Sequence, residues 1–148
     1  MIIEKPGNIL NASEVIIGTP VSCDSNIGRQ AASIFSKYSD AENDYRQALE
    51  RLQAAGISRT MLLGYAALTG QQKDGHIVAN IFCQYEPEDC RPDALSDAMR
   101  KLADLARGQR WSIALPWSIC SRGLSMDAIS EIMKDVECGL YMTEDDMI

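Results

Sequence analysis

The sequence predicts a single α/β domain, a mixed sheet with helices packed on both of its faces. Short apolar runs typical of strands alternate with apolar stripes at helical spacing, and one turn-rich segment joins two strands that are adjacent in the chain. No repeat, linker or low-complexity run divides the sequence. The 148 residues are 46% hydrophobic and 24% charged, enough for one domain with its own core. We therefore expect residues 1–148 to form one folded unit.

The first half of the chain is predicted to contain two strands followed by two helices. Residues 2–4 form a short strand, and residues 14–18 are a continuous apolar run, the pattern of a strand covered on both faces. Helices are predicted over 31–38 and 45–52, because apolar residues recur there at helical intervals. The second helix ends at Gly56, since glycine commonly follows a helix C-terminus.

The second half begins with a predicted antiparallel hairpin. Its strands are residues 61–68 and 76–82, and the segment between them is rich in turn-forming residues. Pro92 lies in the first turn of a third helix that ends near Gly108. The next strand, residues 111–116, ends at its proline.

Three more segments complete the predicted order of elements. The polar residues 118–125 predict a loop, and residues 126–136 predict a helix with an apolar face. Residues 139–142 form a last strand, followed by an acidic tail. This alternation of strands and helices is what predicts helices on both faces of the sheet.

The charge balance excludes several classes of partner. Fourteen Lys and Arg against 21 Asp and Glu give a formal net charge of −7, so we expect no binding of a free nucleic-acid backbone and no membrane partner. No run approaches the roughly 20 apolar residues that span a bilayer, and the N-terminus lacks the pattern of a signal peptide. The expected location is the cytoplasm.

The five cysteines are scattered, and no C-x-x-C spacing occurs among them. This usage predicts reduced packing thiols instead of a disulfide framework. A zinc site built from His76, Cys83 and Cys90 is an open alternative, although its spacing matches no structural zinc pattern. We expect no metal and no other cofactor.

Two predicted loops lead from a strand into a helix, residues 21–29 and 117–125. Ligands of α/β folds bind outside the carboxyl ends of strands, and the small polar residues of both loops allow close approach of the backbone. Arg29 and Arg122 are the only basic residues in these loops. Either guanidinium could bind a phosphate, and a solvated surface position is the alternative for both.

Several short motifs occur in a recognisable order along the chain. They are Gly-Asn-Ile-Leu at 7–10, Val-Ser-Cys-Asp-Ser-Asn-Ile-Gly-Arg-Gln at 21–30, Asn-Ile-Phe-Cys-Gln at 80–84, Ser-Ile-Ala-Leu-Pro at 112–116 and the segment 118–124. In order and spacing they resemble the macro domains, in particular the branch with DNA-linked ADP-ribose hydrolases, terminal ADP-ribose glycohydrolases and ADP-ribose phosphate phosphatases.

The resemblance implies a three-layer α/β/α macro-domain-like sandwich that binds ADP-ribose, or an ADP-ribosylated macromolecule, between the two loops. Asn8 would accept a hydrogen bond from the adenine amine, with a plain turn former as the alternative. Asp24, the carboxylate of the first loop, is the implied catalytic group, with a loop or capping residue as the alternative. The implied ligand-binding residues are Asn8, Ser22, Cys23, Asn26, Gly28, Arg29, Ser118, Ile119, Ser121, Arg122 and Gly123.

The sequence departs from the family pattern in both loops. Gln30 replaces the second glycine of the first loop, and Ser118, Cys120 and Ser121 replace glycines of the second. Glycine serves in such loops because a Cβ blocks the approach of phosphate oxygens to backbone N–H groups. Close cradling of a diphosphate by the backbone is therefore in question.

Two catalytic positions of the glycohydrolase members also differ. The lysine after the N-x-F strand and the aspartate after G-L are replaced by Cys83-Gln84 and by Ser125. Two functions stay open: a nucleotide binder with at most weak hydrolysis of an ADP-ribosyl link or phosphate ester, or an inactive scaffold acting through protein contacts. A cleft filled by Gln30 or Arg122 would favour the scaffold, and an open cleft with a bound anion the binder. The sequence predicts no oligomeric state.

Overall fold

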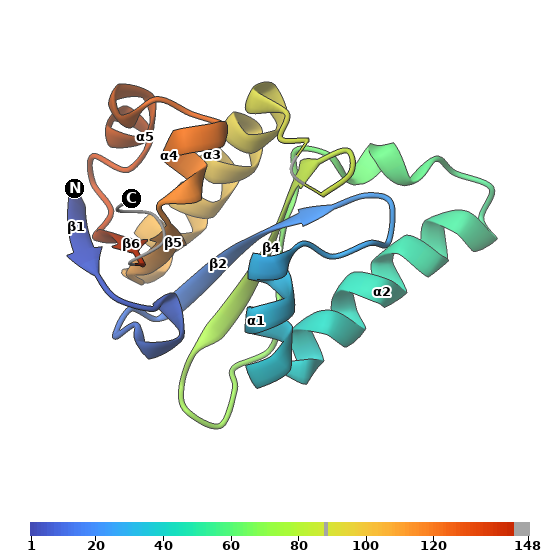
Figure 1. The fold of residues 1–148 in the computed structure, drawn as a ribbon, viewed down its shortest axis with the longest axis horizontal. Coiled ribbons are helices and arrows are strands. Elements are labelled where there is room, and N and C mark those ends of the chain that lie inside the picture. Colours follow the sequence, from blue (N-terminus) through green and yellow to red (C-terminus); the bar gives the residue numbers. More distant parts are fainter. Residues whose placement is uncertain (88, 144–148) are drawn as a thin grey trace.

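The computed structural model describes residues 1–87 and 89–143, with the side chains of Ser121 and Arg122 outside that description. The predicted acidic tail lies beyond the described residues. Six strands form one sheet in the order β1-β6-β5-β2-β4-β3, and Figure 1 shows β2 beside β4. The strands are β1 (Ile2–Pro6), β2 (Ile16–Ser22), β3 (Ala66–Leu68), β4 (Ile77–Gln84), β5 (Ile113–Pro116) and β6 (Cys138–Met142).

The helices cover both faces of this sheet, as the sequence predicts. The α-helices are α1 (Arg29–Lys37), α2 (Ser39–Ala54), α3 (Pro92–Gln109), α4 (Ser118–Arg122) and α5 (Met126–Ile132), and the 3-10 turns are η1 (Ile9–Asn11) and η2 (Arg59–Leu62). The strand pairs are parallel except β3 with β4. The mixed sheet and the α/β class are thus confirmed, and none of the described helices is long and apolar enough to cross a bilayer.

Strand β2 separates two hydrophobic cores. Its seven residues are all buried, and neighbouring residues point to opposite faces because side chains alternate along a strand. Ile16 packs in the core beneath α3 and α5, whereas Ile17 packs in the core beneath α1 and α2. A Cβ at Gly18 would lie 2.8 Å from Leu115 Cδ2, so the small residue allows β5 and its side chains to pack closely.

Two predictions of local structure are wrong. The predicted strand at 61–68 is reduced to β3, because Ser58 Oγ accepts a hydrogen bond from Thr60 N and starts the 3-10 turn η2. Met61 is 63% exposed, so this apolar run does not lie in the sheet. The predicted loop at 118–125 begins with helix α4, whose turn places Ile119 in the core at 3% exposure.

Other boundaries shift without changing the element. The strand predicted at 14–18 begins at Ile16 and continues to Ser22, and the helix predicted over 126–136 ends at Ile132. Glu14, just before β2, is 3% exposed. Its carboxylate accepts hydrogen bonds from the Tyr141 hydroxyl, 2.7 Å from Oε1 and 2.8 Å from Oε2, and from Lys5 Nζ at 2.8 Å. These contacts hold β1 and β6 against the start of β2.

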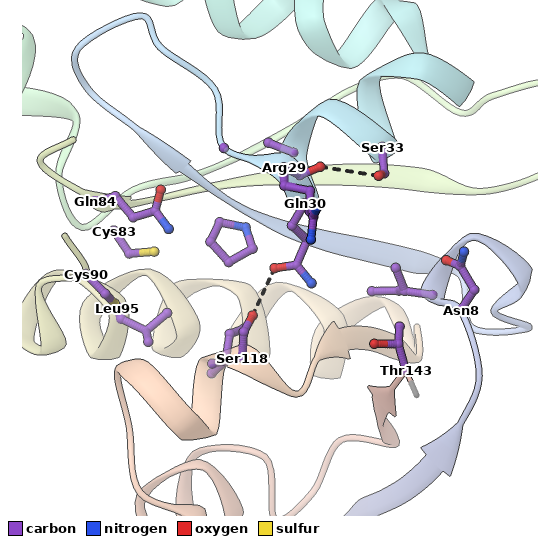
Figure 2. A pocket seen from close by; sticks show the side chains of 15 residues that line it. Asn8, Arg29, Gln30, Ser33, Cys83, Gln84, Cys90, Leu95, Ser118 and Thr143 are labelled. Carbon is purple, nitrogen blue, oxygen red and sulfur yellow. Dashed lines mark hydrogen bonds between the residues drawn. The ribbon is translucent and has the colours of Figure 1, made fainter. Parts of the chain in front are cut away.

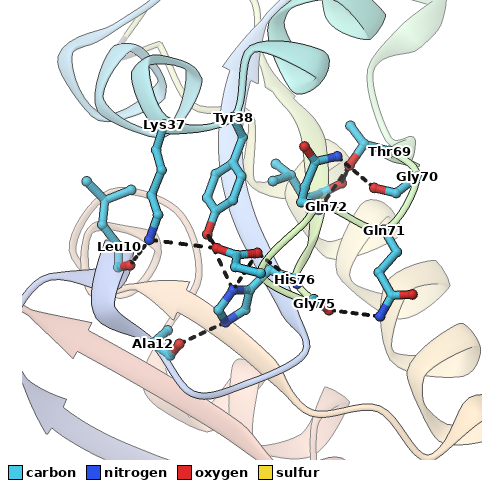
Figure 3. Close-up of polar contacts among 12 residues, drawn as sticks. Leu10, Ala12, Lys37, Tyr38, Thr69, Gly70, Gln71, Gln72, Gly75 and His76 are labelled. Atoms are coloured by element: carbon cyan, nitrogen blue, oxygen red, sulfur yellow. Dashed lines mark hydrogen bonds and ion pairs between the residues drawn. The ribbon is translucent and has the colours of Figure 1, made fainter.

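A polar cluster joins the turn before β4 to the end of α1 (Figure 3). The Tyr38 hydroxyl donates to Asp74 Oδ2 at 2.8 Å, and His76 Nε2 donates to the carbonyl of Ala12 at 2.9 Å. Burial acts to raise the pKa of Asp74, but the hydrogen bonds from Tyr38 and His76 outweigh it and lower the pKa to about 2. Because the contacts of the folded state favour the ionised carboxylate, Asp74 stabilises the fold as long as this carboxylate is ionised.

We predict an acid-sensitive contribution of Asp74 to stability. The difference in free energy of unfolding between the parent and Asp74→Asn should be constant at neutral pH. It should close as the pH falls from about 4, the unfolded pKa of aspartate, toward the folded pKa of about 2. Urea denaturation at a series of pH values measures this difference, and Tyr38→Phe should lose part of the same acid-sensitive stability. A gap that widens in acid would contradict the assignment.

Candidate functional site

A cavity of about 470 Å³ opens at the carboxyl ends of the parallel strands. It lies where the chain leaves β2 for α1 on one face of the sheet and leaves the neighbouring β5 for α4 on the other face. In α/β folds, this divergence of adjacent strands creates a ligand crevice. The lining residues are Asn8, Ile9, Pro20, Gly28, Arg29, Gln30, Ala31, Ser33, Cys83, Gln84, Cys90, Leu95, Ser118, Ile119 and Thr143.

The N-terminus of α1 forms one wall of this cavity. Gly28 is the N-cap residue and has no side chain with which to cap the helix. The first N–H groups of a helix have no partner within the helix, and together with the helix dipole they favour a bound anion. The first turn, Arg29 to Ala31, contains no acidic residue. This wall therefore suits a negatively charged group such as a phosphate.

A side-chain bridge crosses the cavity between α1 and α4. Ser118 Oγ donates a hydrogen bond of 2.9 Å to Gln30 Oε1, and Figure 2 shows this pair near the middle of the site. Asn8 and Thr143 lie on one side of the bridge, and Cys83, Gln84, Cys90 and Leu95 lie on the other. The substitution of Gln30 for a glycine, noted in the sequence, thus places a side chain across the cavity.

The structure brings five of the expected ligand-binding residues to the cavity: Asn8, Gly28, Arg29, Ser118 and Ile119. Asn8 also acts as a turn former, the alternative role that its sequence context suggests. Its Oδ1 accepts a hydrogen bond of 2.9 Å from Leu10 N and caps η1. The side chains of Ser121 and Arg122 lie outside the description, so their expected contacts with a ligand stay predictions.

The remaining expected residues lie beside the cavity and not among its lining. Ser22 is the last residue of β2, and Cys23, Asp24 and Asn26 belong to the loop between β2 and α1. Gly123 caps the C-terminus of α4. A Cβ at Gly123 would lie 2.4 Å from Leu95 Cδ2, so this glycine allows α4 to pack against α3. Its observed role is packing.

Asp24 is held in place by the loop that contains it. Oδ1 accepts hydrogen bonds from Ser22 Oγ at 2.7 Å and from Asn26 N at 2.9 Å, and Oδ2 accepts one from Asn26 Nδ2 at 3.2 Å. Burial acts to raise the pKa of Asp24, but these hydrogen bonds outweigh it and lower the pKa. The carboxylate is therefore ionised at neutral pH and engaged through both oxygens in a local turn.

The cysteines at the site do not form a metal centre. No group of three His, Cys, Asp or Glu residues in the described part of the chain could hold a metal ion. His76 precedes β4 and Cys83 stands near its end, so about 20 Å of strand separates them. Burial raises the pKa of Cys120, which disfavours it as a nucleophile.

Several lining residues were not expected from the sequence, among them Leu95, Cys90 and Thr143. Cys90 follows the loop after β4 and returns to it through a single antiparallel bridge with Gln84. Leu95 belongs to the apolar stripe of α3, which is the signal of an ordinary core residue. Their place in the cavity depends on how α3 packs, and no local sequence pattern indicates that.

No protein-family model matches the sequence, and no curated protein matches it. The macrodomain of Thermus aquaticus DarG has a similar structure at 20% identity and a TM-score of 0.74, covering 96% of this chain and 98% of that chain. A macrodomain protein from Streptomyces coelicolor is 21% identical with a TM-score of 0.76, covering 96% and 99% of the two chains.

A third structure is that of Thermosipho africanus DarTG in complex with ADP-ribose. It is 12% identical with a TM-score of 0.71, and the match covers 96% of this chain and 41% of that chain. At these identities the likenesses show a common fold. The chain has the macrodomain fold, which confirms the fold that its motifs indicate.

We predict that Asp24 stabilises the first loop. Asp24→Ala removes the acceptor for three hydrogen bonds and should lower the free energy of unfolding by about 1–2 kcal/mol, since each such bond has a modest net worth. Asp24→Asn keeps one carbonyl acceptor and should lose less. Urea denaturation of both variants provides the measurement. An alanine variant as stable as the parent would show that other contacts hold this loop.

Proposed function

Because the chain has the macrodomain fold, we propose that it binds ADP-ribose or a related nucleotide, free or attached to a macromolecule, in the cavity between α1 and α4. The observation that carries this proposal is the cavity itself, with the glycine-capped N-terminus of α1 as one wall. Its volume of about 470 Å³ lies in the range of small-molecule sites. The structure of DarTG in complex with ADP-ribose gives a protein of this fold that binds this ligand.

The proposed ligand contacts follow from the chemistry of the lining. The first turn of α1 offers N–H donors to the diphosphate, and the exposed Arg29 adds a positive charge beside it. Asn8 Oδ1 accepts one hydrogen bond from Leu10 N, and a carbonyl oxygen has a second lone pair available for the adenine amine. The net charge of −7 makes these local donors necessary, because the protein as a whole repels anions.

The contacts of Asp24 bear on whether the protein hydrolyses a substrate. Asp24 is the residue expected from the sequence to act on a substrate. Both of its carboxylate oxygens accept hydrogen bonds from Ser22 and Asn26 beside it. A general base must be free to accept a proton within hydrogen-bond reach of the substrate. We therefore propose a binder whose turnover of ADP-ribosyl links or phosphate esters is slow or absent.

The bridge between Gln30 and Ser118 supports a second candidate function. A cleft crossed by side chains could belong to a macrodomain scaffold that acts through protein contacts without a nucleotide. The two candidates differ in one respect, whether ADP-ribose enters the cavity. The cavity remains large with the bridge in place, which favours the binder.

We predict that the protein binds ADP-ribose more tightly than AMP, because the second phosphate and ribose add contacts at the N-terminus of α1. Gly28→Asp should weaken ADP-ribose binding by about tenfold or more, since the new carboxylate competes for the same N–H groups and repels phosphate. Isothermal titration calorimetry measures both effects. Asp is a favourable N-cap, so the helix should keep its stability.

The matched control is Ser36→Asp, which adds the same charge to an exposed position of α1 away from the cavity lining. Its affinity for ADP-ribose should stay close to that of the parent. Equal affinity for AMP and ADP-ribose, or an unchanged affinity in Gly28→Asp, would contradict the proposed placement of the diphosphate. No binding of either nucleotide by the parent protein would favour the scaffold.

We also predict that the bridge opposes ligand entry. Gln30→Ala should bind ADP-ribose about two- to tenfold more tightly, because the parent must break a hydrogen bond with a net worth of roughly 0.5–1.5 kcal/mol. Gln30→Glu keeps an oxygen acceptor for Ser118 and adds a negative charge, so it should bind more weakly than the parent. Weaker binding by Gln30→Ala would instead show that this amide contacts the ligand.

A further inference from the structure

Two cysteines from separate elements meet in the wall of the cavity. Cys83 is the next-to-last residue of β4, and Cys90 stands just before α3. The backbone next to the two cysteines is paired: Gln84 and Cys90 form an antiparallel bridge, and Arg91 N donates a hydrogen bond of 2.7 Å to the carbonyl of Cys83. This backbone pairing holds the two residues side by side.

The two thiols line the same cavity and differ in character. The hydrogen bond from Cys83 lowers the pKa of Cys90, whereas the same contact, followed by burial, raises the pKa of Cys83. Cys83 is fully buried, and Cys90 is partly exposed. Thiolates are the reactive form of cysteine. Cys90 is therefore the accessible and more easily ionised thiol, and Cys83 is its buried partner.

The other cysteines have a different environment. Burial raises the pKa of Cys23 to about 11 and that of Cys138 to about 12, and it also raises the pKa of Cys120. Thiols with raised pKa values react slowly with oxidants, since they carry little thiolate at neutral pH. Oxidation of this protein should therefore select the pair at the cavity.

Cys90 packs against the end of α4 on one side and lines the cavity on another. A Cβ at Gly123 would lie 3.0 Å from Cys90 Sγ, so the sulfur packs directly against the backbone at the end of α4. Leu95 closes another side of the same wall, and both cysteines line the cavity of about 470 Å³. A small oxidant can reach the sulfur through this cavity.

We propose that Cys83 and Cys90 form an oxidation site at which a peroxide of small size converts the two thiols into an intramolecular disulfide. The Cys90 thiolate attacks one peroxide oxygen, the O–O bond breaks, and hydroxide leaves, which gives a sulfenic acid. The Cys83 sulfur then attacks the Cys90 sulfur, loses its proton and displaces the hydroxyl group as water. With hydrogen peroxide, two thiols and one peroxide thus yield one disulfide and two water molecules.

The test uses the full chain, reduced and then treated with stoichiometric hydrogen peroxide. Free thiols are alkylated, and a protease that cuts after glutamate cleaves the protein after Glu88, between the two cysteines, because the Glu86–Pro87 bond resists such proteases. We expect the mass to fall by two hydrogen atoms and the peptides with Cys83 and Cys90 to stay linked until a reductant is added. Three of the five cysteines should then be alkylated.

Variants assign the two roles. Cys83→Ala should leave a sulfenic acid on Cys90 that a dione reagent traps, and Cys90→Ser should leave Cys83 unoxidised. Cys120→Ser, which changes another partly exposed cysteine, is the control and should form the same link as the parent. A linked peptide that contains a different cysteine, disulfides only between protein molecules, or faster oxidation of Cys120 than of Cys90 would overturn the proposal. If a variant fails to fold, the peptide map of the unsubstituted protein after peroxide treatment still shows whether Cys83 and Cys90 become linked.

Discussion

The burial of β2 on both faces determines how the other elements are arranged around it. A parallel strand covered on both sides needs helices above and below the sheet. The chain therefore leaves β2 toward one face and leaves the adjacent β5 toward the other. Gly18 allows the side chain of Leu115 to pack against β2. The cavity at the carboxyl ends of these strands is a consequence of this divergence, whatever ligand it binds.

The chemistry of the cavity reflects a balance between backbone donors and side chains. The N-terminus of α1 offers an electropositive wall because Gly28 leaves its N–H groups uncapped by a side chain. Gln30, two residues later, places an amide across the same space and bonds to Ser118. The net charge of −7 disfavours the binding of any anion. An anionic ligand would therefore depend on hydrogen-bond donors that contact it directly. The site thus combines a wall of backbone N–H donors with a hydrogen-bonded side-chain bridge.

The sequence predicts the large elements well, because their signals are local. The apolar run of β2 and the stripes of α2 and α3 need no knowledge of tertiary contacts. By contrast, α4 forms because Ile119 finds a buried place in a core made by other elements. The same reason explains why no sequence pattern indicates Cys90 as a lining residue of the cavity: its place depends on a bridge to Gln84 that no periodicity encodes. The resemblance of motifs indicated Asn8, Gly28 and Ser118, whose places in the cavity need the whole fold.

The most direct test of the central claim is a titration with ADP-ribose followed by NMR of the backbone amides. Binding in the cavity should shift the amide resonances of the first turn of α1, of Ser118 and Ile119, and of Asn8. The amide of Leu10 should shift too, because it donates a hydrogen bond to Asn8 Oδ1. Amides of η2 and of the turn before β4 lie outside the lining and should change little. Saturating shifts confined to η2 and the turn before β4 would contradict binding in the cavity. The absence of any shift at millimolar ADP-ribose would contradict it as well.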